Sequence, residues 1–187
     1  MVVNEKALVR EMKAAYKEGG YTVAVWDGDW VISGTGWTVI VEGIGNVPRE
    51  ALSLIVLHMG FLPENGEAWE IFKGDNGPLI QKRVFEEAIE QVRRMEAEAE
   101  DAPANSEVRP TGLWLGNVRV WQRVADLKTI LVSPRSSGIM KELKNVIVAG
   151  LWLALEGEIS TVYIRAEDSL GREAKLEHLS RMRWIAE

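Results

Sequence analysis

An Asp-Gly dipeptide at residues 27 and 28 separates two apolar runs, 21–26 and 29–33. The central residues of a type I′ hairpin turn both need a positive φ, and Asp-Gly adopts that conformation readily. A second turn at 34–36 leads into a third apolar run, 37–42. Residues 21–42 are therefore predicted to form an antiparallel three-stranded meander, which restricts the chain to folds with mainly antiparallel sheets.

A helix is predicted before this meander. Asn4 can cap it by accepting a backbone N–H bond, and Gly19-Gly20 ends it. Its apolar residues recur at helical spacing. They are Leu8, Met12, Ala15 and Tyr16.

After the meander, residues 50–59 are apolar almost all round, which predicts a buried helix. Residues 68–73 are predicted to form a strand, and the Gly-Asp-Asn-Gly-Pro cluster at 74–78 a turn. Residues 79–97 then carry apolar side chains at helical spacing, which predicts a second long helix.

Two stretches of the chain share a pattern. Gly60 to Gly77 and Gly150 to Gly171 both open with Gly and two apolar residues, reach a Gly-Glu pair and close on an Asp-containing turn. The match suggests a duplicated unit. The predicted fold is α+β: an N-terminal helix followed by two tandem β-β-β-α-β-α units with mainly antiparallel sheets.

The second unit contains fewer clear signals. Strands are predicted at 113–115, 118–122, 127–132 and 159–167, with Ser136-Ser137 capping a helix and a last helix or strand at 172–184. Ile139, Leu143, Ile147 and Gly150 keep helical spacing, which predicts a helix over 139–150. The β-branched Val146-Ile147-Val148 makes a strand possible there, so helix and strand both remain open for 146–155.

Charge and composition suggest a division of the chain. It comprises the N-terminal helix (1–20), a first unit (21–97), an acidic linker (98–110) and a second unit (111–187). Residues 1–110 hold 11 Lys and Arg against 19 Asp and Glu, whereas residues 111–187 hold 11 against 9. The two parts therefore present different electrostatic potentials to a binding partner.

The chain contains no cysteine, which excludes disulfides, thiolate catalysis and Cys-based metal sites. Its longest apolar run, 146–155, is far shorter than the roughly 20 residues of a membrane helix. We therefore expect a cytoplasmic protein that has no membrane partner and needs no cofactor.

Catalytic and metal-binding residues are not expected. Asp27 and Asp29 form an Asp-x-Asp pair that could chelate a divalent cation, but the turn explains Asp27 better. His58 and His178 fall on non-equivalent elements of the two units, which favours structural roles. An anion site is the alternative for Arg135, Ser136 and Ser137, which together form a predicted helix start.

A binding surface is predicted on the hairpin around Gly116-Asn117. Leu115 pairs with Val118 and Leu113 with Val120 on one face, which should pack on the core. The opposite face then carries aromatic and basic side chains, with two arginines near the C-terminus extending it. These residues are Trp114, Arg119, Trp121, Arg123, Arg181 and Arg183.

The sequence favours a non-catalytic protein-interaction module, such as an inhibitor or regulator of a nucleic-acid-processing machine of the kind mobile elements encode. Nucleic-acid binding through the aromatic and basic face is the alternative. A small-anion or nucleotide binder, or an enzyme, is the third hypothesis. The expected partner is an unidentified protein, and the sequence is compatible with a homo-oligomer.

Overall fold

The structure, a computed structural model, describes residues 3–115, 118–125, 129–132, 134–140 and 144–166. The helices are α1 (Glu5–Glu18), α2 (Arg49–Met59), α3 (Phe85–Glu100) and the short α4 (Pro134–Ser137), with a 3-10 turn η1 (Ile44–Asn46) before α2. The strands of the first half are β1 (Tyr21–Trp26), β2 (Asp29–Gly34), β3 (Trp37–Val41), β4 (Ala68–Gly74) and β5 (Gly77–Arg83). Those of the second half are β6 (Val108–Leu115), β7 (Val118–Arg123), β8 (Thr129–Val132), β9 (Asn145–Ala149), β10 (Trp152–Glu156) and β11 (Ser160–Arg165).

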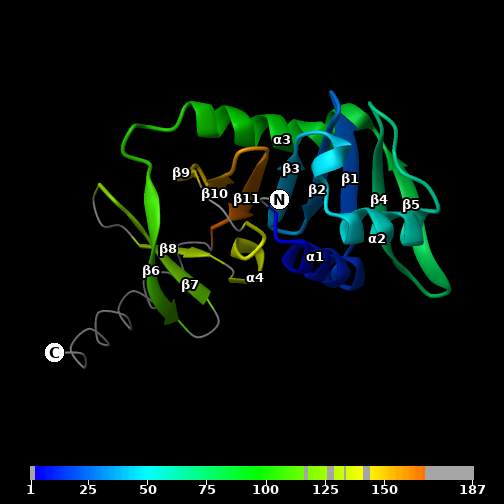
Figure 1. The fold of residues 1–187 in the computed structure, drawn as a ribbon, viewed down its shortest axis with the longest axis horizontal. Coiled ribbons are helices and arrows are strands. Elements are labelled where there is room, and N and C mark those ends of the chain that lie inside the picture. The colour runs from blue at the N-terminus through cyan, green and yellow to red at the C-terminus, as the bar shows by residue number, and fades with distance from the viewer. Residues whose placement is uncertain (1–2, 116–117, 126–128, 133, 141–143, 167–187) are drawn as a thin grey trace.

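Two antiparallel sheets organise these strands (Figure 1). The larger has the order β5-β4-β1-β2-β3-β11-β10-β9, and the smaller has the order β6-β7-β8. Strands β3 and β11 are neighbours, so the larger sheet takes strands from both predicted units. The predicted α+β class, with an N-terminal helix and mainly antiparallel sheets, is confirmed.

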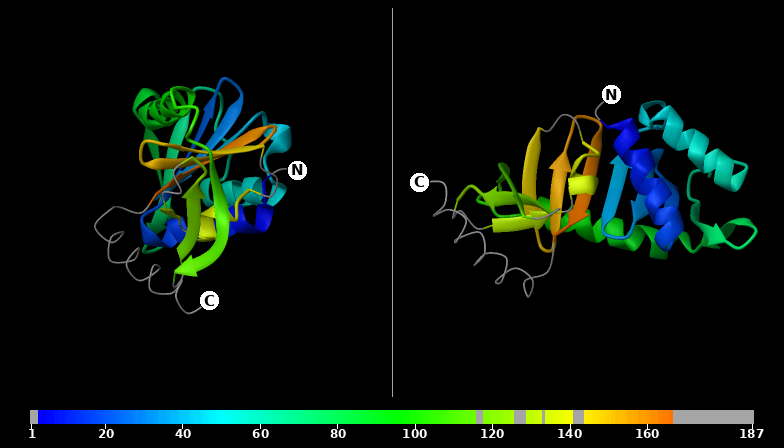
Figure 2. Two further views of the ribbon diagram at one scale, coloured as in Figure 1. Left: turned by 90° about the vertical axis from the view of Figure 1, so that its left-hand side faces the viewer. Right: turned by 90° about the horizontal axis from the view of Figure 1, so that it is seen from below.

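Helices cover both faces of the larger sheet. Buried residues of α1 and α2 share one core with strand residues such as Val23, Ile32 and Leu153. The other face packs on α3 through Ile89 and Val92. In Figure 1, α3 runs along the top of the molecule while α1 and α2 lie below it, and Figure 2 shows the same arrangement from two further sides.

The local predictions for the first elements are confirmed. Asp27 has φ 52° and Gly28 has φ 90°, as the type I′ turn requires. The Asn4 side chain accepts a hydrogen bond from the Ala7 N–H at 3.4 Å and caps α1. The predicted apolar face of this helix is buried at Leu8, Met12 and Ala15, and Tyr16 is half-buried.

The predicted start of the long helix at Leu79 is wrong. Residues 77–83 form β5, which pairs with β4 across the two-residue turn Asp75-Asn76, and α3 begins only at Phe85. Cross-strand pairing with β4 stabilises the extended form, so it outweighs the helical spacing of the apolar side chains. Helix α3 then continues through Glu100, into the segment expected to be an acidic linker.

The helix predicted over 50–59 is confirmed, but the prediction that it is buried is wrong. Helix α2 buries Ala51, Leu54, Ile55 and Met59, but Leu57 is 74% exposed. One side of α2 lies against the sheet and α1, so its remaining apolar residues face outward.

The helix predicted over 139–150 is wrong, and the alternative prediction of a strand around Val146-Ile147-Val148 is confirmed. Residues Asn145–Ala149 form β9, which pairs with β10. After their third strands, both halves continue with a helix and two strands, and they then differ, with α3 in the first half and β11 in the second. The duplication is not confirmed. The last predicted element, 172–184, lies outside the described residues.

The shared core predicts that a substitution in the second half destabilises the whole protein. Leu153 on β10 is fully buried in the core that α1 and α2 cover. Leu153→Ala should lower the free energy of unfolding by about 2–5 kcal/mol. Leu151→Ala is the matched control, since Leu151 is 63% exposed, and should change it by less than about 0.5 kcal/mol. Equal effects of the two variants in chemical denaturation would contradict the shared core.

Candidate functional site

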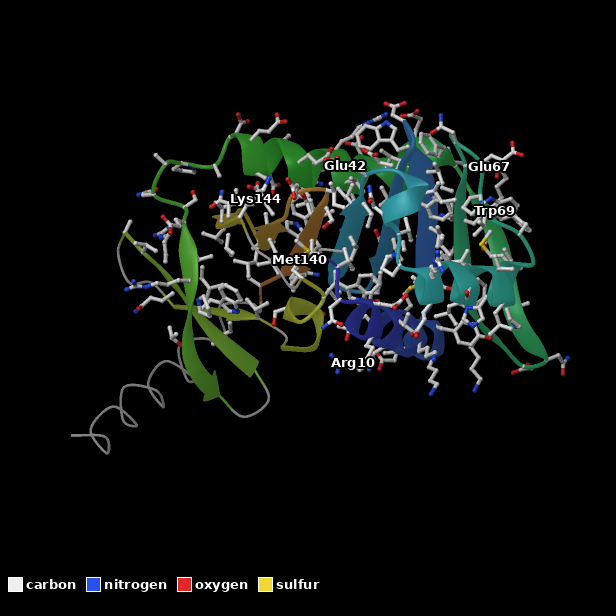
Figure 3. The ribbon with its side chains drawn as sticks, in the orientation of Figure 1. Arg10, Glu42, Glu67, Trp69, Met140 and Lys144 are labelled. Carbon is white, nitrogen blue, oxygen red and sulfur yellow. The ribbon has the colours of Figure 1, made fainter. Side chains whose placement is uncertain are left out.

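Four basic residues form a line along the outer side of α1. They are Lys6, Arg10, Lys13 and Lys17, and we call them the α1 stripe. At 3.6 residues per turn they fall within an arc of about 60° and extend over about 16 Å. All four are exposed. Figure 3 shows Arg10 on the side of α1 that faces away from the sheet.

The amphipathic character of α1 determines where the stripe points. Leu8, Met12 and Ala15 are buried in the main core, and they lie on the opposite side of the helix from the basic residues. Burying the apolar side therefore turns every cation of the stripe toward solvent.

The α1 stripe lines an open groove of about 520 Å³. Apart from the four cations, Glu18 and Glu50 also contribute to its lining. No ion pair within the described part of the chain involves a residue of the stripe. The groove therefore presents mainly uncompensated positive charge, which suits a polyanion.

The opposite side of the protein is acidic. Exposed carboxylates along α3 and just after it are Glu86, Glu87, Glu90, Glu100 and Asp101. Arg93 is partly neutralised, because its Nη1 lies 2.6 Å from Glu86 Oε2. Burial raises the pKa of Glu96, and the nearby Glu100 and Asp29 raise it further. A polyanion is therefore attracted to the α1 side and repelled from the α3 side.

Several contacts hold α1 in position. Glu5 Oε1 accepts a hydrogen bond from the Glu50 N–H at 2.9 Å, which places a carboxylate at the positive end of α2. The Tyr16 and His58 rings stack with their centroids 4.2 Å apart. The Ser136 hydroxyl donates to the buried Glu11 carboxylate at 3.3 Å. The stripe is therefore presented on a helix tied to α2 and α4.

His58 also contacts the core, since its Nδ1 lies 2.9 Å from the Tyr21 hydroxyl. Burial lowers the pKa of His58 and raises that of Tyr21. This pair links α2 to β1 beneath the stacked Tyr16, and a structural role explains both residues. His178, the other histidine, lies outside the described residues.

The predicted aromatic and basic face is only partly described. The backbone register pairs Leu115 with Val118, as predicted, and Trp114 with Arg119. The predicted pairing of Leu113 with Val120 is wrong, because the register shifts between Pro110 and Trp114. Trp121, however, is 1% exposed and lies in the main core, so the prediction that it faces solvent is wrong. Arg123 is half-buried. The side chains of Trp114 and Arg119, and all of Arg181 and Arg183, lie outside the described set.

The predicted anion site is enclosed where it is described. Ser136 and Ser137 are each 5% exposed, and Ser136 points at the Glu11 carboxylate. The Arg135 side chain lies outside the described set. A buried hydroxyl beside a carboxylate is poorly placed to receive an anion.

The Asp27-x-Asp29 pair has a structural explanation. Asp27 occupies the turn, and Asp29 Oδ1 accepts a hydrogen bond from the Gly43 N–H at 3.2 Å. Within the described residues, no group of three His, Asp or Glu side chains could hold a metal ion. No described helix is long and apolar enough to cross a membrane.

The α1 stripe was missed by the sequence analysis, although its signal was present. The basic residues recur at intervals of four, three and four, which places them on one side of a helix.

Comparison with known proteins gives little further information. No protein-family model and no curated protein matches the chain. Similar solved structures include the DNA polymerase III beta chain of Streptococcus pneumoniae (TM-score 0.37, 9% identity, covering 90% of this chain and 65% of that one). The DNA polymerase sliding clamp of Bacillus subtilis has a TM-score of 0.36 and 10% identity, and the match covers 89% of this chain and 64% of that one. The DNA polymerase III beta subunit of Pseudomonas aeruginosa has a TM-score of 0.33 and 10% identity, and the match covers 90% of this chain and 64% of that one. The chain thus spans about 65% of the length of these proteins.

The lowered pKa of His58 predicts how stability depends on pH. As pH falls, the unfolded chain takes up the proton before the folded protein does. The stability that depends on neutral His58 is therefore complete above about pH 6.5, the ordinary pKa, and is lost as pH falls toward the lower folded pKa. Denaturation across this range should show a smaller pH dependence for His58→Gln than for the wild type. Identical pH dependence would contradict the assignment.

Proposed function

We propose that the protein is a non-catalytic binding protein that holds a nucleic-acid backbone against the α1 stripe. The observation that carries the proposal is the line of four exposed cations on one side of a firmly anchored helix. Lys and Arg in such a line neutralise successive phosphates without reading the bases.

The dimensions of the stripe agree with this ligand. A duplex carries one phosphate charge per about 1.7 Å of its axis when both strands are counted, so a length of about 16 Å holds roughly ten phosphates, some of which face the stripe. Four cations can therefore each find a phosphate, on a duplex or on a single strand. Binding of this kind is independent of sequence and falls steeply as salt rises.

The acidic α3 side favours one orientation of the protein on a nucleic acid. Exposed carboxylates repel phosphates, and they lie on the face of the sheet opposite to α1. A nucleic acid therefore approaches the α1 side first. The face of the second hairpin stays in the proposal as a further contact through Trp114, Arg119 and Arg123, with Arg181 and Arg183, but without Trp121.

A protein partner is the second candidate, and the exposed side of α2 favours it. Val56, Leu57 and Phe61 are 42%, 74% and 41% exposed, and Phe61 packs edge-on against Trp69 at 5.1 Å. Neighbouring exposed apolar side chains are typical of protein-binding surfaces. The narrower hypothesis, an inhibitor or regulator of a nucleic-acid-processing machine of the kind mobile elements encode, combines this surface with the α1 stripe.

The salt dependence of binding tests the nucleic-acid proposal. Each cation removed from a duplex complex should lower the slope of log K against log salt by about 0.9. Arg10→Gln/Lys13→Gln should therefore lower the slope by about 1.8 with a labelled duplex and by about 1.4 with its single strand, measured by fluorescence anisotropy. Lys73→Gln, which removes an exposed lysine on β4, should leave it unchanged. Absence of binding by the wild type at low salt would refute the proposal.

The second candidate predicts that one substitution on α2 abolishes partner capture. A charge at the 74% exposed Leu57 would have to be desolvated in an apolar interface, which costs several kcal/mol, whereas the folded protein tolerates it. Leu57→Asp should lose a partner that the wild type retains in an affinity pull-down. Leu151→Asp, exposed but far along the sheet, is the control and should retain that partner. If both variants capture the same proteins, α2 is not the contact surface.

A further inference from the structure

Strand β5 forms an open edge of the larger sheet. It pairs with β4 on one side, and no other described strand lies beyond it (Figure 1). The opposite edge is covered, because the β9 residue Val148 donates its N–H to the Ser106 carbonyl at 3.0 Å and Ile147 bridges to Glu107. Among the described residues, one edge is therefore protected by the chain itself and the other is uncovered.

The hairpin register determines which backbone groups face outward. Gly74 and Gly77 close the two-residue turn and form a hydrogen-bonded pair, after which hydrogen-bonded and non-hydrogen-bonded pairs alternate. Leu79, Gln81 and Arg83 consequently bond to β4. The outward groups belong to Pro78, Ile80 and Lys82, and Pro78 has no N–H.

Charged side chains often protect such an edge, but here they are tied back to β4 and the loop before it. Lys82 Nζ lies 2.7 Å from Glu67 Oε1 and 5.3 Å from the centroid of the Trp69 ring. Hydrogen bonds from Lys82, the Glu64 N–H and the Trp69 indole lower the pKa of Glu67 to about 2, so the pair is ionised at neutral pH. Arg83 Nη1 is held 3.0 Å from Glu70 Oε2. The backbone of the edge is therefore accessible.

We propose that a second copy of this chain pairs with β5 as an antiparallel strand, with a two-fold axis at Gln81. In this register Ile80 of each copy exchanges both backbone hydrogen bonds with Lys82 of the other, giving four bonds in total. The outward N–H groups of Ile80 and Lys82 then both donate hydrogen bonds to the other copy, and none of these bonds requires an N–H from Pro78.

Neighbouring symmetric registers are less favourable. Pairing Ile80 with Ile80 places Pro78 opposite Lys82 of the other copy and loses the bond that a proline cannot donate. Pairing Lys82 with Lys82 places like charges directly opposite each other. Strand β5 is therefore complementary to itself in one register, which favours a second copy over an unrelated segment as its partner. Because the pairing has two-fold symmetry, it forms a closed dimer.

The side chains of β5 also support the pairing. Leu79 and Ile80 are 51% and 37% exposed, and both would be partly covered. Leu79 would lie beside the aliphatic part of Arg83 of the other copy, with the two Gln81 amides adjacent at the axis. Exposed apolar residues thus lie where the second strand would add contacts.

The dimer would place both α1 stripes on one side, because directly opposite residues of antiparallel strands share a face. A nucleic acid could then contact both copies, which would deepen the proposed function. The dimer itself does not depend on that function, and it is tested without nucleic acid.

Single cysteines test the register cleanly, since the chain has none of its own. The Cα atoms of Gln81 in the two copies should lie about 4.5 Å apart, within the range of a disulfide. The Cα atoms of Val84, which is 61% exposed, should lie about 20 Å apart. Under mild oxidation, Gln81→Cys should form the covalent dimer at least about tenfold faster than Val84→Cys, read on a non-reducing gel. Equal rates would overturn the proposal.

A proline variant separates strand pairing from accidental collision. Ile80→Pro removes an outward N–H without removing a bond to β4. Adding it to Gln81→Cys should reduce the trapping rate to that of Val84→Cys, with circular dichroism reporting that the fold is retained. Undiminished trapping in the folded double variant would also overturn the proposal.

Discussion

The pairing of β3 with β11 is the interaction on which the rest of the structure depends. Five residue pairs join Trp37–Val41 to Ser160–Ile164, far apart in the sequence. This contact makes one sheet out of the β1–β3 meander and the C-terminal strands. It also gives the sheet two long faces, each of which has to be covered by helices because the strands carry apolar residues on both sides.

Covering the two faces separates the charges of the protein. Helix α1 buries Leu8 and Met12 on one face, while α3 buries Ile89 and Val92 on the other. The polar side of α1 is basic and that of α3 is acidic, so the sheet separates a positive surface from a negative one. The proposed binding function follows from this arrangement of amphipathic helices rather than from a pocket with convergent reactive groups.

Local signals in the sequence predicted the local structure well. The Asp27-Gly28 turn and the Asn4 cap depend on a few neighbouring residues, and both are confirmed. The spacing of apolar residues is ambiguous in short runs, so it wrongly predicted a helix for most of β5 and could not distinguish helix from strand for β9. Their extended forms depend on pairing with β4 and β10, which no local pattern encodes.

The candidate site was harder to predict than the fold. Side chains of the hairpin alternate between its two faces, and the prediction put Trp121 on the exposed one. Both faces carry large apolar residues, so the alternation does not determine which face is buried. The burial of Trp121 depends on packing against the rest of the core. The α1 stripe was readable from spacing alone. Its importance emerges only beside the acidic α3, which lies on the far face of the sheet.

Lysine footprinting tests the central claim most directly. The chain would be acetylated briefly at low salt, with and without a short duplex, and the labelled lysines identified by mass spectrometry. The account predicts that the duplex protects Lys6, Lys13 and Lys17 and leaves Lys73 and Lys144 equally reactive, since these two are exposed on other elements. Protection of Lys73 or Lys144 without protection of the α1 lysines would contradict it.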